Sequence, residues 1–342
     1  MILFCGFNGF KQFLSLSNNE KYISENDVIG NFFSCKVDYE PSLVSVSWSN
    51  ILIWSNKKLI LSGFVNGEPG KSESLDIPFK ESVIQTSCGK LVSTIVTSSG
   101  QVWQYNIDSG IWKNISNLFY AEVLDKDQGK IVKVCNGGTL NVALSDTGVA
   151  YCIPNILNYS GKIKDVACGK EHGVLLTEDG SVLTWGGGSR GQLGTGDLES
   201  SETLCEVEAL SGLRVVVISA GGWHTAVVTE EGDLYTWGWN KQGQLGFPTI
   251  DIEKENGVSV LATPRPVDLP ENMLVEQVSC GASHTIIKLR DGDILGCGWN
   301  KWGQLGLKGV QRCSTMTKLP VTPEASVRQL VCGPWNTVLL CN

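Results

Sequence analysis

The chain has 342 residues, of which 42% are hydrophobic and 18% are charged, and its formal net charge is −8. This composition is typical of a folded globular protein and excludes a disordered chain, and no apolar run approaches the roughly 18 residues of a membrane-spanning helix. The acidic balance, without any run of Lys or Arg, argues against direct binding to nucleic acid or to an anionic membrane. The N-terminal stretch has no charged lead and no cleavage-like site, so we expect no secretion.

In chain order, the first predicted elements are weak copies of one half-motif, at Val46-Ser-Trp-Ser-Asn50, at Cys88-Gly89 and at Cys135 with Gly137. Four clearer copies follow: Cys168-Gly-Lys-Glu-His172, Ala220-Gly-Gly-Trp-His224, Cys280-Gly-Ala-Ser-His284 and Cys332-Gly-Pro-Trp-Asn336. An apolar, β-branched run comes after each clear copy, and three of these runs end in a polar turn that contains glycine. This pattern predicts β-hairpins.

A second half-motif follows the three hairpins. Its copies are Trp185-Gly-Gly-Gly-Ser-Arg-Gly-Gln-Leu-Gly194, Trp237-Gly-Trp-Asn-Lys-Gln-Gly-Gln-Leu-Gly246 and Cys297-Gly-Trp-Asn-Lys-Trp-Gly-Gln-Leu-Gly306. The glycines predict positive φ angles in a tight loop. Anchors at positions 46, 88, 135, 168, 220, 280 and 332 give seven units, and a mean of about 49 residues suits a four-stranded blade. We therefore expect an all-β, seven-bladed β-propeller that forms a single domain over residues 1–342.

The ends and the irregular spacings add three expectations. The last unit stops at Asn342 without its second half-motif, whereas Cys5-Gly-Phe-Asn-Gly-Phe-Lys-Gln12 copies that half-motif. We expect the N- and C-terminal strands to pair and close the ring, which removes exposed sheet edges. The short interval before Cys168 predicts a blade with a missing outer strand or a trimmed loop. Residues 247–266 predict an inserted loop without regular structure, which is a second candidate for partner binding beside simple tolerance of an insertion.

The Gly-x-x-His and Trp-Gly-x-Asn-x-x-Gly-Gln-Leu-Gly motifs resemble those of the regulator of chromosome condensation propellers, most strongly over residues 163–337. This family includes a chromatin-bound exchange factor for a small nuclear GTPase, ubiquitin-ligase subunits and scaffolds without activity, so the fold alone does not decide function. The Phe-Cys-Gly-Phe opening, the Gly-Gly-Trp-His segment and the Cys-Gly-Pro-Trp-Asn ending are most similar to a small member of the family. That similarity implies a nuclear or cytoplasmic scaffold for a JmjC-domain oxygenase. The implied role is in histone methylation and chromosome segregation, with histone or chromatin contacted indirectly.

The histidines and cysteines are weak candidates for chemistry. His172, His224 and His284 occupy one repeat position, which the other units fill with Asn50, Val92, Thr139 and Asn336. This position offers a metal site or, as we favour, hydrogen bonds at strand ends. The twelve cysteines include no Cys-x-x-Cys pair, so we interpret them as reduced thiols of the cytosol or nucleus. Five recur at one repeat position, where a small apolar side chain packs: Cys88, Cys135, Cys168, Cys280 and Cys332. No motif for catalysis or for a cofactor is present.

Tryptophan is the strongest candidate for partner binding. Strand direction alternates along each unit, so the loops of both half-motifs fall on one face of the ring. Trp is enriched in binding hot spots, and the alternative role of these side chains is packing between blades. Trp185 and Trp237, at strand ends, are expected in the core, whereas Phe7 and Phe10 join the loop face. The predicted partner-binding residues are Trp48, Trp223, Trp239, Trp299, Trp302 and Trp335.

Two functions remain open. The leading interpretation is a non-catalytic, monomeric interaction scaffold. The alternative is a guanine-nucleotide exchange factor for a small nuclear GTPase, and the acidic balance together with the lack of a basic tail argues against it.

Overall fold

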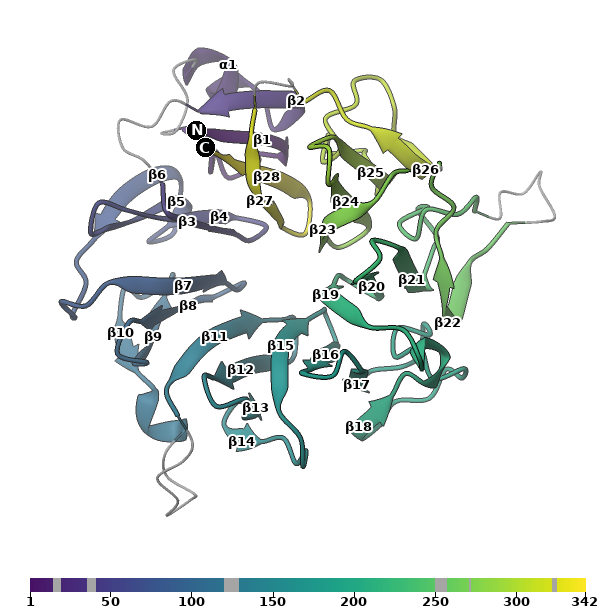
Figure 1. The fold of residues 1–342 in the computed structure, drawn as a ribbon. Helices are drawn as coiled ribbons and strands as arrows, with labels where there is room; N and C mark the ends of the chain where they lie inside the picture. Colours follow the sequence, from purple (N-terminus) through teal and green to yellow (C-terminus); the bar gives the residue numbers. More distant parts are fainter. Residues whose placement is uncertain (15–19, 36–40, 120–128, 250–256, 271, 322–324) are drawn as a thin grey trace.

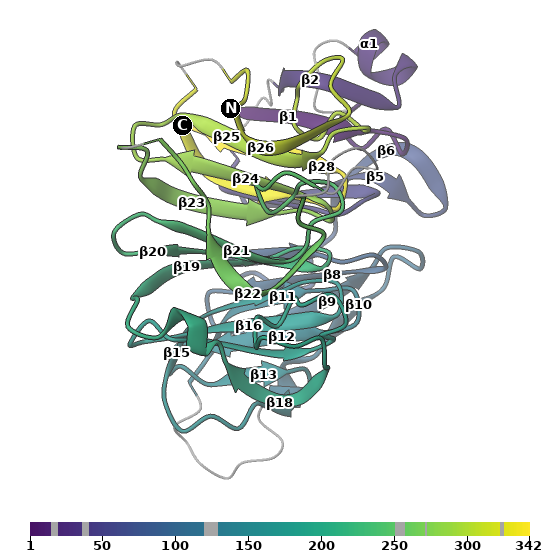
Figure 2. The same ribbon diagram turned by 90° about the vertical axis from the view of Figure 1, so that its right-hand side faces the viewer.

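Seven four-stranded sheets surround a common axis in the computed structural model, and this confirms the predicted β-propeller (Figure 1). The structure describes residues 1–14, 20–35, 41–119, 129–249, 257–270, 272–321 and 325–342. Figure 2 views the ring from its side, with the strands running between its two faces. None of the described helices is long and apolar enough to cross a membrane.

Each blade is built from four strands that we number from the axis outward. The first strands are β3 (Leu43–Val46), β7 (Val83–Cys88), β11 (Ile131–Asn136), β15 (Ile163–Cys168), β19 (Val215–Ala220), β23 (Val275–Cys280) and β27 (Val327–Cys332). The second strands are β4 (Asn50–Ser55), β8 (Val92–Thr97), β12 (Asn141–Ser145), β16 (His172–Thr177), β20 (His224–Thr229), β24 (His284–Leu289) and β28 (Asn336–Cys341). The third strands are β5 (Lys58–Val65), β9 (Val102–Asn106), β13 (Ala150–Cys152), β17 (Val182–Gly186), β21 (Leu234–Trp239), β25 (Ile294–Trp299) and β1 (Ile2–Phe7). The fourth strands are β6 (Glu68–Leu75), β10 (Trp112–Asn114), β14 (Asn155–Ile156), β18 (Ser201–Glu206), β22 (Val260–Pro266), β26 (Arg312–Lys318) and β2 (Val28–Cys35).

The first strand named in each of the four lists belongs to blade 1, the second to blade 2, and so on up to blade 7. Blade 1 therefore consists of β3, β4, β5 and β6, and blade 7 of β27, β28, β1 and β2. Short helical segments lie between strands at α1 (Glu20–Glu25), η2 (Ser116–Phe119) and η3 (Glu208–Leu210). We call the loop between a blade's first and second strands its 1–2 loop. The loop between its third and fourth strands is its 3–4 loop.

The core lies between neighbouring blades, because the second strand of each blade is covered on both of its faces. In β16, β20 and β28 every residue is buried, and their sequences are apolar and β-branched apart from the polar strand ends. Strands buried on both sides are expected to carry such continuous apolar runs rather than an alternating pattern. The fourth strands, such as β18 and β6, are mostly exposed and carry polar and charged residues.

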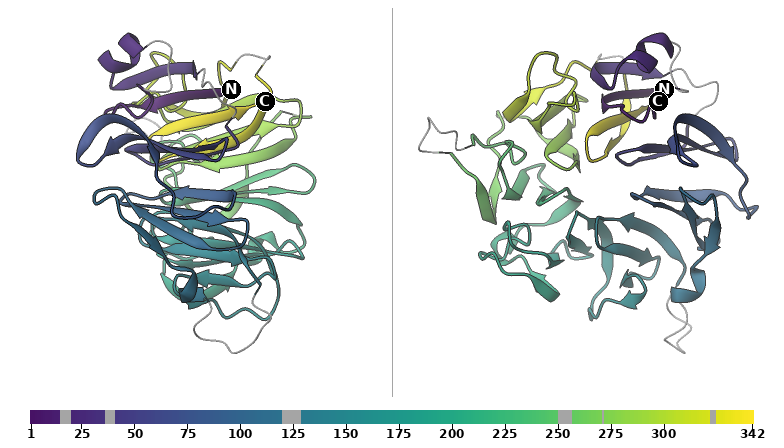
Figure 3. Two further views of the ribbon diagram at one scale, coloured as in Figure 1. Left: turned by 90° about the vertical axis from the view of Figure 1, so that its left-hand side faces the viewer. Right: turned by 180° about the vertical axis from the view of Figure 1, so that it is seen from behind.

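The ring closes in blade 7, where strands from both ends of the chain share one sheet. Strand β1 lies between β28 and β2, and Ile2 pairs with Leu340. The two termini lie side by side in Figure 1 and in the rear view of Figure 3. Gly6 supports the prediction that residues 5–12 copy the second half-motif. Its φ is +116°, and a Cβ there would lie 2.5 Å from the Trp335 carbonyl oxygen. The corresponding Gly238 has a φ of +101° and the same 2.5 Å clearance from the Trp223 carbonyl oxygen. Closure by the terminal strands is therefore confirmed.

Blade 3 corrects two sequence predictions. Asn136, not Cys135, occupies the anchor position, because its backbone N–H donates to Ser87 Oγ of the preceding blade at 2.9 Å. The N–H of Cys280 makes the equivalent bond to Ser219 Oγ at 3.0 Å. The residue at the histidine position is consequently Leu140 rather than Thr139, since Gly137 N–H donates to the Leu140 carbonyl. The short interval before Cys168 predicted a missing outer strand or a trimmed loop. The outer strand is present as β14, which has only two residues.

The predicted inserted loop also needs correction in its second half. Residues Val260–Pro266 form β22, the outer strand of blade 5, and pair with β21. They supply a normal fourth strand rather than an irregular insertion. Residues 250–256 of the predicted loop lie outside the described residues.

All twelve cysteines are free thiols in the structure. Burial raises the pKa of the Cys280 and Cys332 thiols to about 12. Thiols with pKa values this high are poor nucleophiles near neutral pH, so both residues act as small packing groups.

Candidate partner-binding face

The 1–2 loops and the 3–4 loops meet on one face of the ring, as the strand directions predicted. Trp48 and Trp335 belong to 1–2 loops, while Phe7, Phe10 and Trp302 belong to the third strands and 3–4 loops. Trp335 nevertheless contacts Phe7 and Trp302, with ring centroids 5.5 and 6.1 Å apart. Both kinds of loop therefore contribute side chains to the same surface.

Buried asparagines hold the 3–4 loops in shape. The Asn240 amide donates to the carbonyls of Phe247 and Val258 at 3.0 and 2.9 Å, and its oxygen accepts from Leu245 N–H. Asn300 repeats this pattern in blade 6. Such bonds fix a loop that has no sheet partners of its own.

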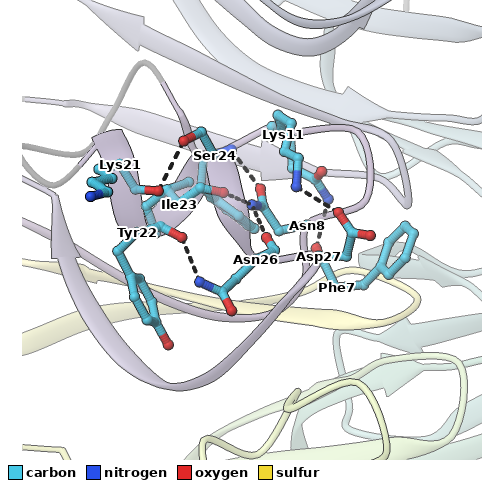
Figure 4. A network of polar contacts seen from close by, with 11 residues as sticks. Phe7, Asn8, Lys11, Lys21, Tyr22, Ile23, Ser24, Asn26 and Asp27 are labelled. Carbon is cyan, nitrogen blue, oxygen red and sulfur yellow. Dashed lines mark hydrogen bonds and ion pairs between the residues drawn. The ribbon is translucent and has the colours of Figure 1, made fainter.

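Asn8 plays the same part in blade 7. Its amide donates to the Ile23 and Asn26 carbonyls, both at 2.9 Å (Figure 4). Its oxygen accepts from Phe13 N–H. Helix α1 therefore belongs to the 3–4 loop of this blade, and Asn8 fixes the loop that carries Phe10.

Seven half-buried aromatic side chains form one connected group over blades 6, 7 and 1. Ring centroids of neighbouring members lie between 4.9 and 6.4 Å apart, which is the usual range for favourable aromatic pairs. We call this group the aromatic cluster; its members are Phe7, Phe10, Trp48, Phe64, Trp299, Trp302 and Trp335.

One position of the 3–4 loop connects blades 4, 6 and 7 to the blade that follows each of them. Phe10 of blade 7 packs on Trp48 of blade 1 at 4.9 Å, and Trp302 of blade 6 stacks on Trp335 of blade 7. At the equivalent position in blade 4, the guanidinium of Arg190 lies 4.8 Å from the Trp223 ring of blade 5. In blades 4, 6 and 7 this position therefore reaches across the blade junction to the following 1–2 loop.

The junction of blades 5 and 6 lacks both aromatic partners. Gln242 stands at the position of Trp302 and Phe10, and Ser283 stands at the position of Trp335 and Trp223. A pocket of about 410 Å³ opens here, lined by Gln242, Trp299, Gln311 and Arg312. The aromatic surface is thus interrupted at a recess with one wall formed by an indole.

A separate aromatic pair lies at the junction of blades 4 and 5. Trp223 and Trp239 meet edge to face at 5.4 Å. Arg190 lies over both rings, at 4.8 and 4.6 Å, and the Lys170 ammonium lies 4.1 Å from the Trp223 ring. Glu171 accepts a hydrogen bond from Trp223 Nε1 at 3.3 Å.

The three histidines connect successive second strands instead of sharing one centre. Nε2 of His172 lies 2.9 Å from Oγ1 of Thr225, and His284 lies 3.1 Å from Thr337 in the same way. Burial lowers the pKa of His172 to about 4 and that of His284 to about 3. Within the described part of the chain, no group of three His, Cys, Asp or Glu side chains is arranged to hold a metal ion.

The structure divides the six predicted tryptophans between two places. Trp48, Trp299, Trp302 and Trp335 join the aromatic cluster, whereas Trp223 and Trp239 form the pair beside Arg190. Trp185 and Trp237 are buried in the core, as predicted. The sequence reasoning missed Phe64, Lys170 and Arg190. Arg190 aligns with Phe10 and Trp302 inside the second half-motif, and this alignment would have placed it at the blade junction.

Two sequence models of the regulator of chromosome condensation (RCC1) repeat match this chain. One matches residues 179–228, 231–287 and 291–340, and the other matches residues 163–192, 215–244 and 275–304. The chain belongs to the regulator of chromosome condensation family. Among curated relatives of this chain, human RCC1 domain-containing protein 1 is 35% identical over 208 residues, or 52% of this chain and 55% of the relative. The ultraviolet-B receptor UVR8 of Arabidopsis thaliana is 35% identical over 223 residues, or 52% of this chain and 50% of the receptor. The chain thus spans about half the length of these relatives.

Solved structures share the fold of this chain over almost its whole length. Human WBSCR16 superposes with a TM-score of 0.81 at 18% identity, covering 100% of this chain and 99% of that chain. Yeast RCC1 (Prp20), in its complex with Kap60, gives 0.80 at 16% identity, covering 99% and 88%. These identities are low, so the likeness establishes the fold alone.

Proposed function

We propose that this RCC1 propeller is a non-catalytic scaffold that binds a protein partner through the face carrying the aromatic cluster. The observation that carries the proposal is the gathering of seven half-buried aromatic side chains on one loop face. Aromatic side chains supply large contact area at little entropic cost, and they dominate binding hot spots.

The pocket beside Trp299 gives the proposed interface an anchor point. At three other junctions of this face a 3–4 loop side chain packs on the next 1–2 loop. Here Gln242 and Ser283 stand at the corresponding positions, and the junction holds a pocket. An apolar or aromatic side chain of the partner would pack against the indole there. Gln242 and Gln311 would supply hydrogen bonds at the rim, as is usual for anchored interfaces.

We further propose that the partner is a JmjC-domain oxygenase and that the complex acts in histone methylation control and chromosome segregation. The support is the resemblance to a small member of the family and the 35% identity to RCC1 domain-containing protein 1. On this proposal the chain works in the nucleus or cytoplasm and reaches chromatin through its partner.

The test is a direct binding measurement between the full chain and purified JmjC-domain oxygenases. Trp299→Ala and Trp335→Ala should each weaken binding at least tenfold, with thermal unfolding showing that the variants remain folded. Trp112→Ala is the matched control, because Trp112 is also half-buried but lies on the outer strand β10 of blade 2. Equal affinity for wild type and both cluster variants would overturn the proposed binding face.

The competing exchange-factor function makes a different prediction. An exchange factor accelerates release of a fluorescent nucleotide from a small GTPase at substoichiometric concentration. This function remains an alternative because the chain shares the fold of yeast RCC1, which was studied for its binding to Gsp1p and histones. We expect no acceleration by this chain with nuclear GTPases, and a catalytic release rate would overturn the scaffold proposal.

A further inference from the structure

The junction of blades 4 and 5 carries two positive charges that have no acidic partner among the residues that the structure describes. We propose that Arg190, Lys170 and the Trp223–Trp239 pair form a binding site for an acidic peptide segment, rich in Asp or Glu, of a protein partner. This inference rests on the proposed scaffold function and names a second contact on the same face.

Arg190 is held in place by two indoles and by its own loop. Its guanidinium lies 4.8 Å from the Trp223 ring and 4.6 Å from the Trp239 ring. The backbone N–H of Arg190 donates to Gln192 Oε1 at 2.9 Å, and the following Gly191 has a φ of +71°. A side chain fixed in this way loses little conformational freedom when a ligand binds.

Lys170 approaches the same indole from a different loop. Its ammonium lies 4.1 Å from the Trp223 ring, and the residue is exposed. Lys170 belongs to the 1–2 loop of blade 4, whereas Arg190 belongs to the 3–4 loop of that blade. The two cations therefore come from separate loops and share the Trp223 ring.

Neither cation has an acidic partner within the described residues. Other cations of the chain do form ion pairs, as in Lys288 with Glu276 at 2.8 Å and Lys318 with Asp293 at 2.5 Å. At this junction the nearby carboxylate of Glu171 accepts from Trp223 Nε1 instead. Two cations without an ion pair to any described carboxylate therefore lie together in a chain whose net charge is −8.

The chemistry of these groups selects a carboxylate-bearing ligand. An indole face stabilises a cation but offers no acceptor in the plane of the guanidinium, so the N–H groups of Arg190 remain available to an acceptor on a ligand. Carboxylates satisfy guanidinium with paired, charge-assisted bonds. The two cations sit on different loops beside aromatic walls, an arrangement that suits successive acidic side chains along an extended segment better than a single small anion.

The experiment measures fluorescence anisotropy of a labelled twelve-residue peptide of alternating Glu and Ser with the full wild-type chain. A peptide with Gln in place of Glu is the neutral control, and a phosphoserine peptide without Glu is a third arm. We expect the Glu peptide to bind, the Gln peptide not to bind, and the affinity for the Glu peptide to fall with added salt.

The variants Arg190→Gln and Lys170→Gln should each reduce affinity for the Glu peptide at least fivefold, with unchanged melting temperatures. Lys113→Gln is the matched control, because Lys113 is exposed on β10 of blade 2. Absence of Glu-peptide binding, an equal loss in Lys113→Gln, or binding of the phosphoserine peptide alone would each overturn the proposal. The peptide assay involves no residue of the aromatic cluster, so it can fail while Trp299→Ala and Trp335→Ala still weaken oxygenase binding, and the reverse also holds.

Discussion

Nε2 of His224 lies 2.9 Å from Oγ1 of Thr285, one blade further round the ring. Thr285 in turn donates from the same oxygen to the Gln244 carbonyl at 2.7 Å. Because that hydroxyl has given its proton to Gln244, it must accept from an N–H at Nε2 of His224. The same relation joins His172 to Thr225 and His284 to Thr337. Three neutral histidines therefore link blades 4 to 7 through the core.

The buried histidines predict a loss of stability in mild acid. Burial lowers the pKa of His172 to about 4 and the pKa values of His224 and His284 to about 3, against about 6.5 in an unfolded chain. Between pH 6.5 and 4 the unfolded chain therefore binds protons that the folded chain does not. The free energy of unfolding should fall as the pH falls through this window, by about 1.4 kcal/mol per pH unit for each histidine.

Urea unfolding between pH 7.5 and 5 measures this effect. The variant His224→Asn, which copies the residue found at Asn336, removes one titrating group. Its pH slope should be about one third smaller than that of wild type. An identical slope would show that His224 is accessible and protonated in the folded chain.

Replacing Gly6 should show how much the pairing of β1 with β28 contributes to the stability of the chain. Its φ of +116° is unfavourable for any other residue, and a Cβ would lie 2.5 Å from the Trp335 carbonyl oxygen and from the Cα of Asn336. Gly6→Ala should therefore destabilise the chain by about 2 kcal/mol or more, measured as a lower denaturant midpoint. Gly30→Ala, in β2 of the same blade, is the control, because a Cβ there meets nothing within 4 Å. Similar midpoints for both variants would contradict the closure described for β1 and β28.

The seven-bladed fold and its closure were predictable because they depend on features within one repeat. The glycine that precedes Phe7 and Trp239 is part of the second half-motif and has a positive φ in both copies, so Gly6 marked the N-terminal copy. Blade 3 was misaligned by one residue because Cys135 matched the recurring cysteine, while the bond to Ser87 that defines Asn136 belongs to the neighbouring blade. Contacts between blades have no fixed spacing in the sequence.

The candidate site was less predictable for the same reason. The loop positions suggested a shared face, but which rings meet depends on pairs of loops from different blades. Trp299 and Trp239 occupy equivalent positions, yet Trp239 packs against Trp223 whereas Trp299 borders a pocket, because Ser283 replaces the second tryptophan. Lys170 gave no signal in the sequence, since a lone surface lysine is commonplace.

Replacing Asn240 should show how much the buried asparagine stabilises the 3–4 loop of blade 5. Asn240→Ala would leave the Leu245 N–H and the carbonyls of Phe247 and Val258 without their partner, at a cost of about 2–4 kcal/mol in the free energy of unfolding. Chemical denaturation measures the loss, and Asn31→Ala, at an exposed position of β2, should change stability by less than about 0.5 kcal/mol. A loss for Asn240→Ala as small as that of the control would show that the loop holds its shape without this amide.

Filling the pocket beside Trp299 should weaken binding of the proposed partner while the chain stays folded. Gln242→Trp places an indole where Trp302 lies in blade 6, so it should pack against Trp299 and occupy the roughly 410 Å³ recess. The melting temperature should stay unchanged or rise, because the added ring buries apolar surface without displacing a packed neighbour. Binding of the partner should weaken at least tenfold, equivalent to about 1.4 kcal/mol. Lys241→Trp adds the same indole at the adjacent exposed position and should leave affinity within about twofold of wild type. Retained binding by a well-folded Gln242→Trp variant would show that the partner does not enter this pocket.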